Sequence, residues 1–100
     1  MTLYNIYYGT IGKTLGCKYH FSKYCKDEQS AIKLAQDSAS SLYYKYEGKY
    51  GIPLFNTVLK ESEITGIDIE DLYKEHINDM MRWYAIPFED DIISSKDIKL

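Results

Sequence analysis

A glycine-rich segment between two runs of β-forming residues constrains the first quarter of the chain most strongly. Residues 2–8 are rich in β-branched and aromatic types, residues 9–16 hold three glycines, and residues 17–25 begin with alternating apolar and polar positions over residues 17–22. Two such runs with a glycine-containing connection are typical of an antiparallel hairpin. We therefore predict strands over residues 2–8 and 17–25, joined by a long tip.

A long amphipathic helix is predicted to follow the hairpin. Between residues 28 and 47 the apolar side chains recur at steps of three and four, which places them in one stripe along a helix. Asp27 precedes this stretch and is suited to cap its N-terminus. Gly48 follows it and is suited to end it at the C′ position.

Two shorter helices and a third strand account for the rest of the pattern. Asn56 can cap a helix over about residues 57–64, and Asp68 can open another helix. Residues 83–88 then alternate with a period of two, which predicts a strand that returns to the hairpin. Pro87 cannot donate a ladder hydrogen bond, so this strand should lie at a sheet edge or end there.

This order of elements predicts an α+β fold. We expect a three-stranded antiparallel sheet, made of the N-terminal hairpin and the C-terminal strand, with two or three helices packed on one face. A chain of 100 residues has the usual size of one domain. We assign residues 1–88 to this single domain and residues 89–100, which begin with three acids, to an acidic tail that frays.

The hairpin tip contains Gly12, Lys13 and Thr14, a combination that also ends phosphate-binding P-loops. Two requirements of a P-loop fail. Tyr7 stands where the pattern needs its first glycine, and a predicted strand follows where the phosphate needs the N-terminus of a helix. We interpret the segment as a hairpin tip, and an anion held by its backbone N–H groups and Lys13 stays open as an alternative.

The two cysteines predict neither a disulfide nor a metal site. Strict alternation in the second strand places Cys17, Tyr19 and Phe21 on one face and His20 on the other. Cys17 and Cys25 would then share a face about 26 Å apart, much farther than a disulfide permits. We predict two free thiols in a reducing, cytoplasmic setting, with no metal and no cofactor. No apolar run approaches a membrane span, and the first residues do not resemble a signal peptide.

Nothing in the sequence predicts catalysis. No serine or cysteine has a recognisable nucleophile signature. His76 falls on the apolar face of the third helix, where a core histidine with a satisfied ring is expected. The acids of residues 68–79 fall mainly on the solvent side of that helix, and nothing in the sequence suggests that they are buried. We predict that the protein is not an enzyme.

The charges are divided along the chain. Residues 1–26 carry four lysines and no acid, whereas residues 61–91 carry ten acids against one lysine and one arginine. Such a division can steer a partner or align two copies head to tail, and two solvated faces that differ in charge are the plain alternative. The net charge of −3 and the single arginine make nucleic acid an unfavoured partner.

Tyrosine is the most unusual component, with eleven in the chain and seven in two clusters: Tyr4, Tyr7, Tyr8 and Tyr43, Tyr44, Tyr46, Tyr50. A tyrosine offers a large apolar body with a polar end, which suits binding surfaces. The alternative is that these rings replace phenylalanine and leucine in an ordinary small core. We predict a ligand- or partner-binding surface from residues near the two glycine-containing loops, namely Tyr7, Tyr8, Gly12, Lys13, Tyr46 and Tyr50.

The outline of residues 2–86, with the turn Tyr46-Glu47-Gly48, resembles small proteins carried by bacterial viruses. The resemblance implies an inhibitor that binds a host protein or a signalling nucleotide, and it carries no site residues. We predict a small non-catalytic protein–protein interaction or inhibitor module, with a homo-oligomer as one form. A protein that binds a nucleotide or another small anion is the first alternative. Binding of single-stranded nucleic acid by the basic, aromatic hairpin is the second.

Overall fold

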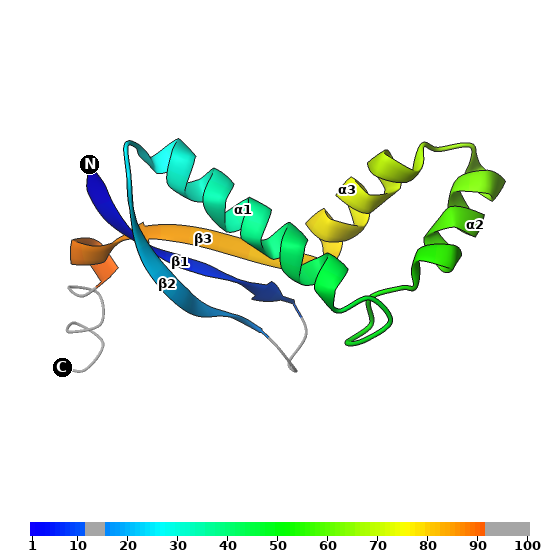
Figure 1. Ribbon diagram of the computed structural model, residues 1–100, viewed down its shortest axis with the longest axis horizontal. Helices are drawn as coiled ribbons and strands as arrows, with labels where there is room; N and C mark the ends of the chain where they lie inside the picture. The colour runs from blue at the N-terminus through cyan, green and yellow to red at the C-terminus, as the bar shows by residue number, and fades with distance from the viewer. Residues whose placement is uncertain (12–15, 92–100) are drawn as a thin grey trace.

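The computed structural model describes residues 1–11 and 16–91 and shows one sheet with helices (Figure 1). The three strands form an antiparallel sheet in the order β2-β1-β3, so the predicted α+β fold is confirmed. Gly12 and Lys13 lie outside the described residues, as does most of the predicted tail, residues 92–100. The elements are β1 (Thr2–Thr10), β2 (Cys17–Cys25), α1 (Glu28–Lys45), α2 (Phe55–Thr65), α3 (Ile69–Met80) and β3 (Met81–Pro87).

Helix α1 covers one face of the sheet. Its buried residues follow one another at steps of four, and three of the four are alanines that let the helix approach the strands closely: Ala31, Ala35, Ala39 and Tyr43. Tyr4 and Ile6 of β1 pack into the same core. At the start of the helix, the Asp27 side chain accepts a hydrogen bond from the Ser30 backbone N–H at 2.8 Å, as the sequence predicts.

Helices α2 and α3 form an arm that continues beyond the end of the sheet (Figure 1). They pack on each other through buried apolar residues that include Val58 on α2 and Leu72 on α3. The His76 ring lies across this contact, with Nε2 at 3.2 Å from Glu61 Oε2. His76 therefore has a partner within the arm, as expected for a structural histidine.

The two helix starts in the arm differ in how they are capped. Asn56 is not the cap of α2, because the helix starts one residue earlier, after Leu54. The Glu47 carboxylate replaces it by accepting a hydrogen bond from the Phe55 backbone N–H at 3.1 Å. Asp68 is the N-cap residue of α3, as predicted, but its side chain makes no capping hydrogen bond.

A β-bulge in β2 changes which residues share a face. Ile6 pairs with Phe21 while Tyr7 pairs with Tyr19, so β2 has one extra residue, His20, at this point. An extra residue reverses the alternation of the strand. The prediction that Phe21 lies on the same face as Tyr19 is therefore wrong: Phe21 packs against the core, and Tyr19 faces away from it.

The bulge also separates the two cysteines. Cys25 is buried in the core beneath α1, whereas Cys17 pairs with Gly9 on the far side of the sheet. The prediction that the two thiols share one face is thus wrong, although both are free.

The third strand ends where the sequence indicates. β3 pairs only with β1 and is an edge strand that finishes at Pro87. Trp83 and Ala85 pack toward the core, so the residues between them face the opposite side. Beyond Pro87, residues 88–91 are helical and turn back toward the sheet.

Candidate binding surface on the open face of the sheet

The face of the sheet opposite α1 is not covered by α1, α2 or α3, although the helical residues 88–91 contact it, and we call it the open face. Its members follow from the strand alternation, the register and the bulge. They are Leu3, Asn5, Tyr7 and Gly9 on β1, Cys17, Tyr19, Ser22 and Tyr24 on β2, and Arg82, Tyr84 and Ile86 on β3.

Three tyrosines form a row across the open face. Tyr7 on the central strand pairs with Tyr84 on one side and Tyr19 on the other. The Tyr7 and Tyr19 rings meet edge to face, with their centroids 5.9 Å apart. Tyr19 and Tyr84 are 50% and 52% exposed, so a half-buried central ring lies between two rings that are free to contact a partner.

A chain of hydrogen bonds fixes the middle of the open face. The Tyr19 hydroxyl lies 2.9 Å from Ser22 Oγ, and Ser22 Oγ donates to Asn5 Oδ1 at 2.6 Å. Asn5 is only 7% exposed, yet both ends of its amide have partners within the described residues. A satisfied polar network of this kind holds side chains in one arrangement, which gives the Tyr19 ring a defined position.

The carboxylate of Asp91 anchors the C-terminal helical residues to the same network. Asp91 Oδ2 accepts a hydrogen bond from Asn5 Nδ2 at 2.8 Å and another from the Tyr7 hydroxyl. The second bond, together with burial, raises the pKa of Tyr7 to about 12, because a phenolate could not donate to the carboxylate. Residues 88–91 therefore form a wall beside the tyrosine row.

A groove of about 500 Å³ lies between this wall and the end of the hairpin. Figure 1 shows the N-terminus and the helical residues 88–91 at the same end of the sheet. Leu3 and Tyr24 come from the open face, and Tyr24 is 62% exposed. The residues that define the groove are Leu3, Tyr24, Pro87, Phe88, Glu89 and Asp90.

The opposite end of the open face is closed by the hairpin itself. Gly9 is buried under the backbone of Gly16, and a Cβ placed on Gly9 would lie 1.7 Å from the Gly16 carbonyl oxygen. Cys17 Sγ reaches across Gly9 and lies 3.7 Å from the carbonyl oxygen of Arg82. Only glycine fits here, so this position sets where β2 starts beside β1.

The structure does not bring the predicted site residues together. Tyr7 lies on the open face, but Tyr8 lies on the opposite face, where its ring stacks on His20 with centroids 3.7 Å apart. Tyr46 and Tyr50 contact each other, with centroids 5.2 Å apart, after the C-terminus of α1. Gly12 and Lys13 lie outside the described residues, so their place in a site stays a prediction.

Sequence reasoning missed most of the open face. Tyr19, Tyr24 and Tyr84 are isolated in the sequence, so clustering along the chain does not select them. Their alternation with core residues in predicted strands was the available signal. Asn5 and Asp91 carry no such signal, because their contact joins residues 86 positions apart.

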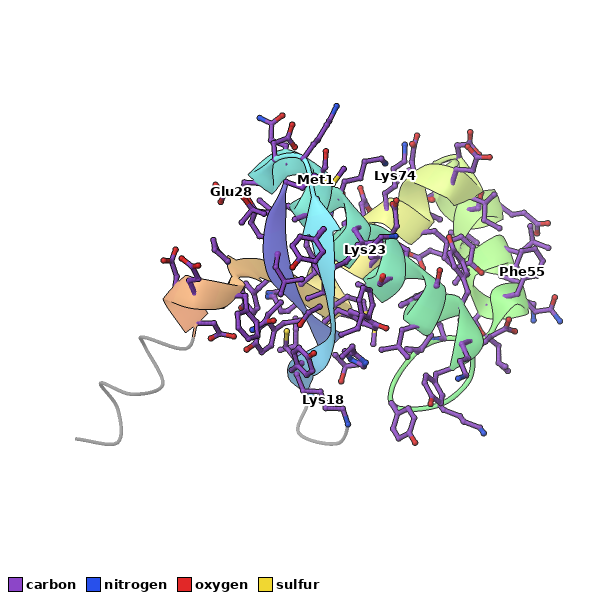
Figure 2. The ribbon with its side chains drawn as sticks, turned by 60° about the vertical axis from the view of Figure 1, so that its left-hand side comes forward. Met1, Lys18, Lys23, Glu28, Phe55 and Lys74 are labelled. Carbon is purple, nitrogen blue, oxygen red and sulfur yellow. The ribbon has the colours of Figure 1, made fainter. Side chains whose placement is uncertain are left out.

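The lysines of the hairpin lie on the other side of the sheet from these tyrosines. Lys18 pairs with Tyr8, and Lys23 pairs with Tyr4, which places both lysines on the α1 side of the edge strand. Figure 2 shows both on β2, with Lys18 nearest the hairpin tip. The open face carries Arg82 beside Gly9, and the acids of residues 89–91 border its other end.

Within residues 1–11 and 16–91, no group of three or more histidine, cysteine, aspartate or glutamate residues is placed to hold a metal ion. None of the helices described combines the length and the apolar character needed to cross a membrane. Comparisons with protein-family models, curated protein sequences and solved structures give no significant match to this chain.

Proposed function

We propose that this protein is a non-catalytic binding protein that captures a protein partner through the open face of its sheet, as an interaction or inhibitor module does. The observation that carries the proposal is the pair of half-exposed rings, Tyr19 and Tyr84, on either side of Tyr7 on a face that α1, α2 and α3 leave uncovered. Tyrosine is enriched among the residues that dominate binding energy at protein interfaces.

The rigidity of this face supports the proposal. Tyr19 is tied to Ser22, Ser22 to Asn5, and Asn5 to Asp91, so the network spans the sheet from the edge strand to residues 88–91. A side chain held in place before binding loses little conformational entropy when a partner arrives. A rigid row of rings therefore binds more tightly than mobile rings of the same area.

The charges favour a protein over a single-stranded nucleic acid. Bases stack on aromatic rings while cations follow the phosphates, so both groups must lie on one surface. Here Lys18 and Lys23 lie on the α1 side of β2, while Asp91 and its acidic neighbours border the tyrosine row. Phosphates laid across the open face would meet these carboxylates at one end, with Arg82 as the basic residue of the face.

The test compares two pairs of tyrosines with similar exposure. Tyr19→Ser/Tyr84→Ser removes the outer rings of the row, and Tyr44→Ser/Tyr50→Ser removes two rings elsewhere that are 52% and 44% exposed. Affinity-tagged wild-type and variant proteins are used to capture partners from the native host. The enriched protein is then purified, and its dissociation constant for each variant is measured by calorimetry.

We expect the row variant, Tyr19→Ser/Tyr84→Ser, to weaken binding by at least about tenfold. The control variant, Tyr44→Ser/Tyr50→Ser, should change the dissociation constant little. Thermal melts of both variants check that the fold is kept. Equal binding by the row variant would refute the open face as the binding surface. Loss in the Tyr44/Tyr50 control instead would assign binding to the loop that follows α1.

A second candidate function, binding of a small anion, rests on a hollow of about 260 Å³ beside Tyr8. Ser38, Ser41, Leu42 and Lys45 also line the hollow. A panel of nucleotides in a thermal-shift assay tests this function, since a ligand at 100 times its Kd stabilises the fold by about 2.7 kcal/mol. Stabilisation that Lys45→Ala abolishes would support this second function.

A further inference from the structure

The groove beside residues 88–91 differs in character from the tyrosine row. Its walls combine polar and apolar surface, and the apolar side chains of Leu3, Tyr24, Pro87 and Phe88 contribute to them. Tyr24 and Phe88 are 62% and 37% exposed, so both rings are available to a ligand. A volume of about 500 Å³ lies within the range of pockets that hold a compact ligand or a few residues of a peptide.

The charged side chains that line the groove are both acids, Glu89 and Asp90. Both side chains are exposed. Asp91 follows directly, but its carboxylate is occupied by Asn5 and Tyr7. The two free carboxylates favour a cation, and the face of an aromatic ring such as Tyr24 favours one as well.

Building on the proposed function, we propose that this groove holds a basic peptide segment of the protein partner. One large apolar side chain of the segment fits between Tyr24 and Phe88. An adjacent lysine or arginine binds the carboxylates of Glu89 and Asp90. Apolar contact gives the segment its anchor, and the acids select its charge and orientation.

The position of the groove makes this segment continuous with the main interface. Tyr24 belongs to the same strand and the same face as Tyr19, so one partner can cover the tyrosine row and place a segment in the groove. Glu89 and Asp90 are held there because Asp91 fixes the end of the helical turn to Asn5. Binding in the groove should therefore depend on Asp91 without direct contact to it.

The chain's own C-terminal residues offer a competing occupant. Residues 92–100 follow Asp91 directly in the sequence and include Lys96 and Lys99. Of the two, Lys99 lies between Ile98 and Leu100, which is the apolar and basic combination that the groove is proposed to select. The experiment therefore includes a chain that stops after Asp91, alongside the full chain.

The probe is a displayed library of random twelve-residue peptides, selected against the full-length protein. Enriched peptides are synthesised, and their affinities are measured by fluorescence anisotropy. The groove variants are Tyr24→Ser and Glu89→Gln/Asp90→Asn. Matched controls are Glu63→Gln/Glu70→Gln, two exposed acids on the arm, and the row variant Tyr19→Ser/Tyr84→Ser.

We expect enriched peptides to carry a large apolar residue next to lysine or arginine. Their affinity should fall about tenfold in Tyr24→Ser and at least about fivefold in Glu89→Gln/Asp90→Asn. The acids on the arm should leave it unchanged. These results would support peptide binding in the groove even if Tyr19→Ser/Tyr84→Ser leaves partner binding unchanged, because different variants alter the two surfaces.

Four results would overturn the inference. The first is enrichment of acidic peptides, and the second is enrichment of none. The third is affinity that responds to Tyr19→Ser/Tyr84→Ser but not to the groove variants, which would leave the proposed function standing. The fourth is binding seen only after truncation at Asp91, which would make the chain's own C-terminal residues the occupant of the groove.

Discussion

The hydroxyl of Tyr43 allows a sharp prediction about the core. Tyr43 is 1% exposed, and its ring meets the rings of Tyr44 and Tyr73 edge to face, at centroid distances of 5.7 Å and 6.1 Å. Its hydroxyl has no hydrogen-bond partner among the described residues. Burial raises the pKa of this phenol to about 12. Tyr43→Phe keeps the packed ring and removes the unpaired hydroxyl.

The size of the effect follows from the cost of burying a polar group without a partner. Leaving a buried donor unsatisfied costs about 1–3 kcal/mol, and Tyr43→Phe should recover about 1 kcal/mol of it. For a domain of this size, that gain corresponds to a rise of about 4–8 °C in Tm. Tyr43→Ala, which also removes the ring, should instead cost about 3–5 kcal/mol.

Urea unfolding measures this change directly. Trp83 is the only tryptophan and packs against both core clusters, so its fluorescence reports loss of the core. Tyr44→Phe, at a half-exposed position, is the control and should change the free energy of unfolding little. A loss of about 1 kcal/mol or more in Tyr43→Phe would mean that the hydroxyl is satisfied, and would refute the reasoning.

Three further predictions concern pH and local geometry. The pKa values of Tyr7 and Tyr43 lie near 12, above the ordinary value of 10.0, so folding favours the neutral phenols. Their contribution to stability should be complete below pH 10 and decline as pH rises from 10 toward 12, with phenolate absorbance showing a late-titrating group of tyrosines that Tyr7→Phe and Tyr43→Phe each reduce. Gly9→Ala should lower the free energy of unfolding by about 1–3 kcal/mol, because its Cβ would clash with the Gly16 backbone. Gly16→Ala should cost less, because a Cβ there meets nothing within 4 Å, although the φ of Gly16 is 61°. Asp27→Ala should reduce helical circular dichroism and Tm, whereas Asp27→Asn should retain most of both because its amide oxygen still caps α1.

The fold could be predicted because its elements carry strong local patterns. The glycine-rich tip separates two β-forming runs, and the alanines of α1 recur every fourth residue. Pro87 marks the end of an edge strand because proline has no backbone N–H to donate to a neighbouring strand. Each of these signals depends on neighbours in the sequence, so no knowledge of distant contacts was needed.

The bulge could not be predicted, because it depends on the pairing with another strand and not on neighbours in the sequence. Alternation shows how side chains would point in a regular strand, but it does not show where one extra residue enters the pairing. His20 enters between Tyr19 and Phe21, and the two rings consequently lie on opposite faces. The register with β1 decides this position, and that register is a tertiary property.

The candidate surface could be predicted only in part. Tyr7 was selected from its sequence cluster, but strand alternation already separates it from Tyr8. Tyr84 lies beside Tyr7 because the first and last strands pair, and nothing in the sequence around either residue indicates this pairing. Asp91 belongs to an acidic run that looks like a solvated tail. Only the folded chain shows that its carboxylate meets Asn5 and Tyr7.

The footprint of the purified partner on this protein tests the central claim most directly. Amide and tyrosine-ring NMR signals of the labelled protein are followed as the partner is added. The account predicts that the largest shifts fall on Tyr19, Tyr84 and Ser22, with the rings of Tyr46 and Tyr50 unaffected. Shifts confined to α1 and the loop that follows it, with the open face unchanged, would contradict the account.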